Sequence, residues 1–318
     1  MHSEALYQPR RPARSMSVPV RGLSYHLQVW GDPSLITPER PALVMGHGYM
    51  DVGASFQFVV DALADLEGEA RYIIAPDWRG FGLTRMPPVD TYWFADYLGD
   101  LDGLLAAPEL GLAADESIDL LGHSMGGNIV MIYAGVRPTR IRKLINLEGF
   151  GMPRTEPHES PQRLARWLHD LRQPKSLRGY PSVDGVAERL RQNNRRLPAD
   201  KAAWLARQWS EQREDGFWHI LGDPAHKGIG ALLYRVEEVL ACWQRISAPV
   251  LWVEGDETDT RQWWGDRYPR SDFESRLDAV FRLERHRLTQ CGHMLHHDQP
   301  EALAALLKAF LDAPQASA

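Results

Sequence analysis

The sequence has little cysteine, no long hydrophobic run and no excess of positive charge. Two cysteines in 318 residues, Cys242 and Cys291, cannot form a disulfide framework, and such scarcity is typical of the reducing cytoplasm. No run of about 18 apolar residues occurs, so no membrane-spanning segment is predicted. The formal net charge of −6 argues against a general nucleic-acid-binding protein. Arginines near the N-terminus are not followed by an apolar stretch, so we expect residues 1–17 to form a loose arm rather than a signal peptide.

The composition is that of a globular protein with a large core. Hydrophobic residues make up 44% of the chain and charged residues 25%, and the length suits one elaborated domain. The unusual feature is the presence of 11 tryptophans, most of them outside the apolar strand-like segments.

Strand-like and helix-like segments alternate over most of the chain, which predicts an α/β fold with a doubly wound, mostly parallel sheet. A hairpin at the sheet edge is predicted over residues 18–30. The other predicted strands cover residues 41–45, 72–75, 118–121, 141–147, 249–253 and 282–288. The predicted helices between them cover residues 56–66, 92–105, 272–280 and 301–311.

The alternation stops between about residues 150 and 247. This segment shows no convincing strand and four helical patterns, at residues 161–171, 183–193, 199–214 and 229–243. We therefore predict an all-helical cap at residues 151–247, inserted into a core formed by residues 18–150 and 248–318. A cap would cover the carboxyl ends of the strands, where open α/β sheets bind their ligands.

The sequence Gly-His-Ser-Met-Gly at positions 122–126 follows an apolar strand and precedes a small, apolar helix-like segment. A serine on such a sharp strand-to-helix turn is held with its oxygen exposed, and the flanking glycines leave room for the turn. This pattern makes Ser124 a candidate nucleophile. Taken alone, it also fits an ordinary glycine-rich turn.

Three further motifs accompany it: Gly-His-Gly-Tyr at positions 46–49, Asp-Trp-Arg-Gly-Phe-Gly-Leu-Thr at 77–84, and Gly-His at 292–293. In order and spacing, the four motifs resemble those of the α/β-hydrolase fold family. The resemblance covers residues 18–150 and 248–312. It implies that Ser124 is the nucleophile and His293 the general base, and that the amides of Tyr49 and Met125 form the oxyanion hole.

The residues around these motifs allow further interpretations. Three histidines and an aspartate lie within positions 293–298, but no second ligand cluster accompanies them in the sequence, so no metal site is predicted. His296 and His297 are expected at the rim or at the start of the last helix. Cys291 is an improbable nucleophile beside Ser124, and His123 is expected to pack. The 77–84 segment is interpreted as structural, with Arg79 pairing with an acid.

The acid of the triad is ambiguous. The usual position in the family lies three residues after the glycine that ends a late strand, and Thr258 occupies it here; Asp256 and Asp259 miss this spacing. The other position follows the preceding strand, as in some haloalkane dehalogenases, and Glu148 occupies it. A buried glutamate there needs a partner, which an imidazole N–H would provide. Glu148 is therefore favoured over Asp259, with Asp256 third.

These residues favour hydrolysis of a carboxylic ester of an apolar or aromatic small molecule, with no cofactor. Tryptophans of the cap could supply an apolar wall, and its arginines could attract a carboxylate. The same triad would serve a carbon–carbon bond hydrolase, for which Arg154 and Arg166 are candidate anion-binding residues, a lactonase or a thioesterase. A non-catalytic ligand-binding protein is the remaining alternative. Neither the substrate nor the oligomeric state follows from the sequence.

Overall fold

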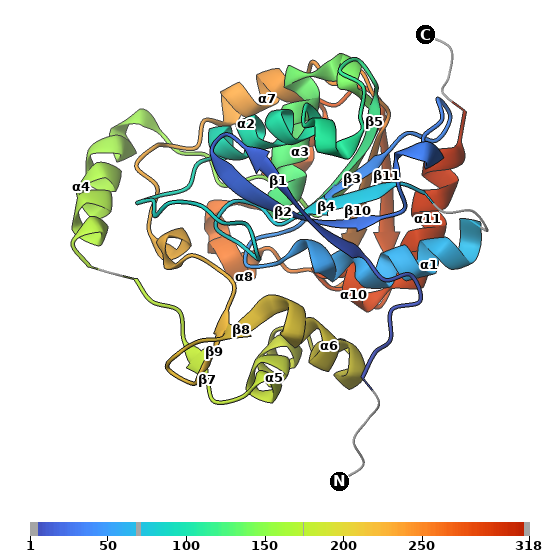
Figure 1. Cartoon of the computed structure of the whole chain (residues 1–318). Helices are drawn as coiled ribbons and strands as arrows, with labels where there is room; N and C mark the ends of the chain where they lie inside the picture. The colour runs from blue at the N-terminus through green and yellow to red at the C-terminus, as the bar shows by residue number, and fades with distance from the viewer. Residues whose placement is uncertain (1–5, 68–70, 174, 315–318) are drawn as a thin grey trace.

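A central eight-stranded sheet with helices on both faces forms the core of the computed structural model, which describes residues 6–67, 71–173 and 175–314 (Figure 1). The strand order is β1-β2-β4-β3-β5-β6-β10-β11. All neighbouring strands are parallel except β1 with β2 and β2 with β4. The bounds are β1 Arg14–Val20, β2 Leu23–Trp30, β3 Leu43–Gly46, β4 Ile73–Pro76, β5 Ile118–His123, β6 Ile141–Leu147, β10 Val250–Gly255 and β11 Leu283–Leu288.

Successive side chains of the central strands enter two different apolar clusters, because side chains alternate across a sheet. Leu120 packs with the helices of one face and Leu121 with those of the other, and both are fully buried. Parallel strands covered on both faces have continuous apolar sequences, as here. The first face carries α2 (Phe94–Leu105), α3 (Met125–Val136), α7 (Val236–Trp243) and α9 (Arg270–Leu277), and the second carries α1 (Gln57–Glu67) and α11 (Pro300–Asp312).

The predicted α/β class, the doubly wound sheet and the edge hairpin are therefore confirmed. The prediction of a loose N-terminal arm is wrong for residues 6–17; residues 1–5 lie outside the described chain. Strand β1 already begins at Arg14. Ahead of it, the Tyr7 hydroxyl donates a 2.5 Å hydrogen bond to Asp61, whose carboxylate also accepts from the amides of Arg10 and Arg11. The buried Asp61 carboxylate thus holds this segment against α1.

The segment 151–247 is not all-helical, which corrects the prediction. Besides α4 (Ser160–Leu171), α5 (Val183–Asn193) and α6 (Ala199–Trp209), it contains a small antiparallel sheet of β7 (Gly179–Tyr180), β9 (Trp218–Ile220) and β8 (Ser210–Gln212). These strands are too short to show an alternating pattern. Strand β8 follows α6 directly, so the sequence pattern extended the helix through it. The helix predicted from residue 229 likewise begins only at Val236.

Several contacts join the insert to the core. Buried side chains of α5 and α6 pack with Val52 and Phe58 of the core. Farther along, the segment after β9 pairs with the 77–84 loop, where the amide of Gly82 donates to the carbonyl of Leu221 and that of Asp223 to Gly80. Figure 1 shows α5 and α6 with the small sheet on one side of the core and α4 as a separate arm.

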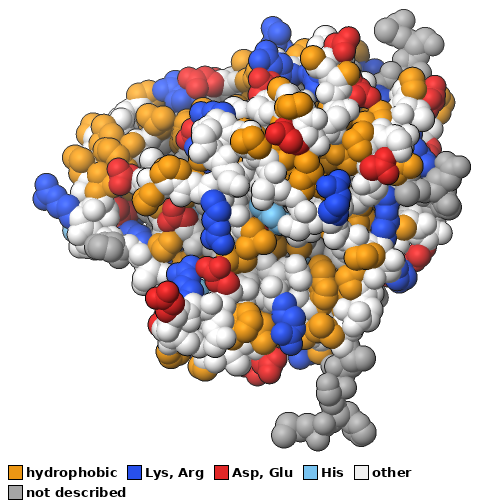
Figure 2. Space-filling view, viewed as in Figure 1, with side chains coloured by type: hydrophobic (Ala, Val, Ile, Leu, Met, Phe, Trp, Pro, Cys, Tyr) orange, Lys and Arg blue, Asp and Glu red, His pale blue; other side chains and the backbone are white. Residues whose placement is uncertain are grey.

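Helix α4 presents apolar side chains to the surface. Leu164, Leu168 and Leu171 share one helix face and are 40–53% exposed. Figure 2 shows hydrophobic side chains gathered at the left of the molecule, over α4. Among the described residues, no helix has the length and apolar character needed to cross a membrane.

Candidate active site

Ser124 lies on the sharp turn between β5 and α3, in a strained backbone conformation with φ 51° and ψ −113°. A positive φ is unusual for a residue with a side chain and is tolerated where the surroundings enforce it. The turn also requires its glycines. A Cβ on Gly126 would lie 2.2 Å from the carbonyl oxygen of Gly46, and one on Gly122 would lie 2.3 Å from that of Gly126.

His293 lies between Ser124 and Glu148 and is hydrogen-bonded to both. Its Nε2 is 2.9 Å from Ser124 Oγ, and its Nδ1 is 2.6 Å from Oε2 of Glu148. Because the carboxylate can only accept, Nδ1 carries the proton and Nε2 is free to accept from the serine hydroxyl. The ring of Trp263 packs edge-on against the imidazole, with 4.4 Å between ring centroids. The structure thus brings together three residues that are far apart in the sequence.

Glu148 follows β6, and its side chain is fully buried. Besides His293, its Oε1 accepts from the amide of Gly255 at 2.7 Å and its Oε2 from the hydroxyl of Thr258 at 3.0 Å. A buried carboxylate without such donors would be costly. Thr258 occupies the usual position of the acid in the family, but no role was predicted for it from the sequence. Its position was the signal that could have identified it as a partner of Glu148.

The structure does not bring the other two acids to His293. Asp259 is exposed, and its carboxylate accepts from the amide of Arg261 in the turn that begins α8 (Arg261–Trp264). Asp256 instead accepts from the amide of Cys291. Of the three candidate acids, the structure therefore places only Glu148 beside His293.

The predicted oxyanion-hole amides belong to Tyr49, after β3, and to Met125, the first residue of α3. Within the described chain, neither amide donates a hydrogen bond to another residue. The start of a helix also favours negative charge. Both residues line the cavity around Ser124. The Tyr49 side chain is half exposed, and its hydroxyl donates to the backbone carbonyl of His226 in the insert.

His47 fixes the loop that carries Tyr49. Its Nδ1 donates to the carbonyl of Gly48 at 2.7 Å, its Nε2 accepts from the amide of Trp78 at 2.9 Å, and Trp78 Nε1 donates to the His47 carbonyl at 3.1 Å. Burial lowers the pKa of His47. The neutral imidazole, with one donor and one acceptor nitrogen, matches these two bonds.

The 77–84 segment makes structural contacts, and Arg79 pairs with an acid. Its guanidinium forms two hydrogen bonds of 2.5 and 2.6 Å with the buried Asp100 carboxylate. Asp77 accepts from the amides of Gly53 and Leu83 at 2.7 and 2.8 Å. These bonds join the segment to α2 and to the loop after Tyr49.

His123, His296, His297 and Cys291, which lie near Ser124 and His293, are all buried. His296 and His297 lie in a short helix of their own, α10 (Leu295–Asp298), with 0% and 3% exposure, so the expectation of a rim position is wrong. His123 donates from Nε2 to the backbone carbonyl of His293 at 2.8 Å, and burial holds its pKa well below the usual range. Burial raises the pKa of the Cys291 thiol to about 12, so this residue is not a thiolate at neutral pH.

Ser124 lies where two cavities meet, with volumes of about 670 and 490 Å³. Tyr49, Trp263 and His293 also line both. Apolar side chains line both cavities; the larger one also has basic and polar side chains at its border, whereas aromatic side chains and methionines dominate the smaller one. Basic residues of the larger cavity are Arg178, Arg189 and Lys227, and apolar residues of the smaller one are Phe94, Met125, Phe150, Met152 and Trp264.

The tryptophans of the insert contribute less to these walls than predicted. Of the five between residues 151 and 247, only Trp209 lines either cavity. Trp204 and Trp218 pack among the helices of the insert, and Trp243 is buried in the core. Two tryptophans of the segment after β10, Trp263 and Trp264, also line the cavities, and no sequence motif links them to the site.

Residues 41–300 match the model of the alpha/beta hydrolase fold family, which is most of the chain. The protein therefore belongs to the α/β-hydrolase fold family. It is 23% identical over 314 residues to a serine hydrolase-like protein of Danio rerio, covering 95% of this chain and 89% of the relative. It is also 34% identical over 108 residues to an epoxide hydrolase of Siraitia grosvenorii, covering 34% of this chain and 32% of that protein.

Solved structures show the same fold. A thioesterase domain from the curacin biosynthetic pathway matches with a TM-score of 0.77 and 25% identity, covering 93% of this chain and 99% of that domain. The family, its fold and these relatives together establish a hydrolase. They do not identify which kind of bond the protein cleaves, because this fold supports many reactions.

Proposed function

We propose that this protein is a serine hydrolase that cleaves carboxylic esters through an acyl-enzyme on Ser124. The observation that carries the proposal is the continuous hydrogen-bonded chain from Ser124 Oγ through His293 to Glu148, with distances of 2.9 and 2.6 Å. Nucleophile, base and orienting acid in this geometry constitute a catalytic triad.

In the first step, Ser124 Oγ attacks the carbonyl carbon of the ester while its proton passes to Nε2 of His293. The buried Glu148 carboxylate stabilises the imidazolium that forms. The amides of Tyr49 and Met125 donate to the oxyanion of the tetrahedral intermediate, each contributing about 3 kcal/mol to barrier lowering by analogy with measured donors. His293 then protonates the departing alkoxide. In the second half, His293 takes a proton from the water molecule that attacks the acyl carbon, and it returns this proton to Ser124 Oγ as the bond between Oγ and the acyl carbon breaks and the acid is released.

The two cavities suggest which ester suits the site. The aromatic and methionine side chains of the smaller cavity would bind an apolar or aromatic group by burial. The basic border of the larger cavity favours a polar or anionic group on the other side of the scissile bond. The substrate class is therefore an ester that joins an apolar part to a polar or anionic part.

Carbon–carbon bond, lactone and thioester cleavage would use the same triad and remain alternatives within it. Arg154 and Arg166, the candidates for anion binding by a carbon–carbon bond hydrolase, line neither cavity. Arg154 instead forms an ion pair with Glu237. No observation raises any of these reactions above ester hydrolysis.

The test uses hydrolysis of short p-nitrophenyl esters by the full-length protein. We expect a burst of p-nitrophenol equal to the enzyme concentration, followed by slower turnover, and loss of both in Ser124→Ala. Ser275→Ala is the matched control, since this exposed hydroxyl donates only to the carbonyl of Asp272. A parent protein without turnover on any ester, or a Ser124→Ala variant with full activity, would contradict the proposal.

A further inference from the structure

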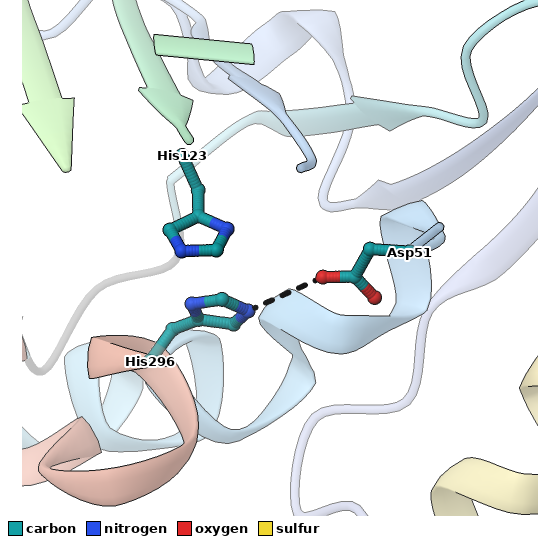
Figure 3. A group of neighbouring side chains, drawn as sticks. All are labelled: Asp51, His123 and His296. Carbon is teal, nitrogen blue, oxygen red and sulfur yellow. Dashed lines mark ion pairs between the residues drawn. The ribbon is translucent and has the colours of Figure 1, made fainter. Parts of the chain in front are cut away.

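Three buried polar side chains meet beside the Ser124–His293–Glu148 chain without belonging to it. Asp51, His123 and His296 are 2%, 1% and 0% exposed, and one potential ligand atom of each lies within 4.8 Å of the others. They come from the loop after β3, the end of β5 and the helix α10. In Figure 3 the two imidazoles and the carboxylate face one another across a small space.

The atoms that face this space lack hydrogen-bond partners. Among the described residues, Oδ2 of Asp51, Nδ1 of His123 and both ring nitrogens of His296 have none. His296 Nε2 and Asp51 Oδ2 lie 3.6 Å apart, which is an ion-pair contact but longer than a hydrogen bond. Buried polar atoms are nearly always satisfied, so an arrangement of this kind needs an explanation.

Asp51 and His123 each make hydrogen bonds through the polar atom that points away from this space, and these bonds orient the side chains toward it. His123 donates through Nε2 to the carbonyl of His293, which leaves the lone pair on Nδ1. Oδ1 of Asp51 accepts from the amide of Val52 at 2.8 Å and from Trp209 Nε1 at 2.9 Å, which leaves Oδ2. An imidazole whose other nitrogen donates to a backbone carbonyl is the usual arrangement of a metal-binding histidine.

We propose that Asp51, His123 and His296 form a binding site for a divalent transition-metal ion of the Zn²⁺ type. Two imidazoles and one carboxylate favour such an ion over Mg²⁺ or Ca²⁺, which prefer oxygen ligands. Zinc–ligand bonds of about 2.0–2.2 Å in a tetrahedron place ligand atoms roughly 3.4 Å apart. Atoms within 4.8 Å reach this spacing by side-chain movements on the order of 1 Å.

The larger cavity lies next to the proposed site, because Asp51 and His123 are among its lining residues, whereas His296 is not. An ion would therefore enter from this side, and a water molecule could complete its coordination there. Gly48 leaves space at His123, because a Cβ on this residue would lie 2.8 Å from Nδ1. The three ligands belong to the segments that carry Tyr49, Ser124 and His293, so metal binding would connect these segments.

The experiment titrates the chelator-treated, full-length protein with Co²⁺ and follows its visible absorption bands, which report coordination without any assay of activity. We expect one equivalent to bind, Zn²⁺ to displace it, and excess Mg²⁺ to have no effect. X-ray absorption spectroscopy of the Zn²⁺-loaded parent should show two imidazole ligands. This second measurement needs no variant, so a variant that fails to fold leaves the proposal testable.

Variants then locate the ion. Asp51→Asn and His296→Gln should each weaken Co²⁺ binding at least tenfold. His297→Gln is the control, because this buried neighbour is not one of the three ligands. His293→Gln tests the nearest alternative, an ion bound at Ser124 and Glu148, and should bind Co²⁺ like the parent. Absence of stoichiometric binding, fewer than two imidazole ligands, or loss of binding in His293→Gln with retention in His296→Gln would each overturn the proposal.

Discussion

The hydroxyl of Thr258 donates a 3.0 Å hydrogen bond to Oε2 of Glu148, the same oxygen that lies 2.6 Å from His293 Nδ1. Thr258 stands where many members of the family carry the acid itself. Here that position supports an acid supplied by another strand. The two loops after β6 and β10 can cooperate in this way because these strands are neighbours in the parallel sheet.

The first prediction concerns the identity of the acid. Glu148→Gln keeps the size of the side chain and removes its charge, so kcat for a p-nitrophenyl ester should fall by roughly 10³–10⁴, the scale observed when a triad acid is neutralised. Asp259→Asn is the matched control and should retain the parent kcat, because Asp259 is exposed and bonds only locally. If Asp259→Asn loses activity and Glu148→Gln does not, the assignment is wrong.

The second prediction concerns Thr258. Thr258→Val removes the hydroxyl at nearly constant volume and leaves one lone pair of the buried carboxylate without its donor. We expect kcat to fall about tenfold, equivalent to roughly 1.4 kcal/mol, with little change in KM. Thr258→Ser keeps the donor and should preserve most of the activity. Equal losses in the two variants would indicate a packing role instead.

The third prediction concerns the basic border of the larger cavity. Arg178 and Arg189 line it, and neither forms an ion pair among the described residues. The double change Arg178→Gln/Arg189→Gln should lower kcat/KM about tenfold for an ester with a terminal carboxylate, while the corresponding methyl ester is little affected. Two exposed charges should stabilise the bound carboxylate in the transition state by about 1 kcal/mol or slightly more, and this effect on kcat/KM should weaken in high salt.

The control for this prediction is Arg191→Gln, an exposed arginine on the same helix as Arg189 that does not line the cavity. It should discriminate between the two esters as the parent does. If the double variant affects both esters equally, the basic residues do not select an anionic group.

The fourth prediction concerns stability at acidic pH. The ring of His226 stacks between Phe81 and Tyr92, with centroid distances of 3.9 and 3.6 Å, and burial lowers its pKa to about 4. In the unfolded chain a histidine titrates near pH 6.5. Between these values the unfolded state binds more protons, so the free energy of unfolding decreases as the pH falls from 6.5 to 4.

Urea unfolding of the parent and of His226→Phe measures this contribution, because phenylalanine preserves an aromatic ring and does not titrate. Between pH 7 and pH 5 the parent should lose about 1–2 kcal/mol more of its unfolding free energy than the variant. The other buried histidines are present in both proteins and cancel in the difference. Parallel pH profiles of the two proteins would show that His226 makes no such contribution.

The parts of the protein that follow from local sequence were predicted well. The alternating strands and helices, the turn at Ser124 and the placement of His293 after a late strand are each encoded within a few residues. Side-chain periodicity and glycine requirements act over that range. The insert was predicted less well, because its strands of two or three residues carry no periodic signal. The tryptophan that lies against His293, Trp263, belongs to the segment after β10 and not to the insert.

What the sequence alone determined is the α/β-hydrolase fold and the residue types available for chemistry at Ser124 and His293. Tertiary structure decided which acid reaches the imidazole, since Glu148 and His293 are 145 positions apart and meet only when the loops after β6 and β11 lie at the same end of the sheet. It also gathered Asp51, His123 and His296 in one buried space. Hydrogen bonds and metal coordination depend on distances of a few ångströms, and these are set by how strands and helices pack rather than by sequence spacing.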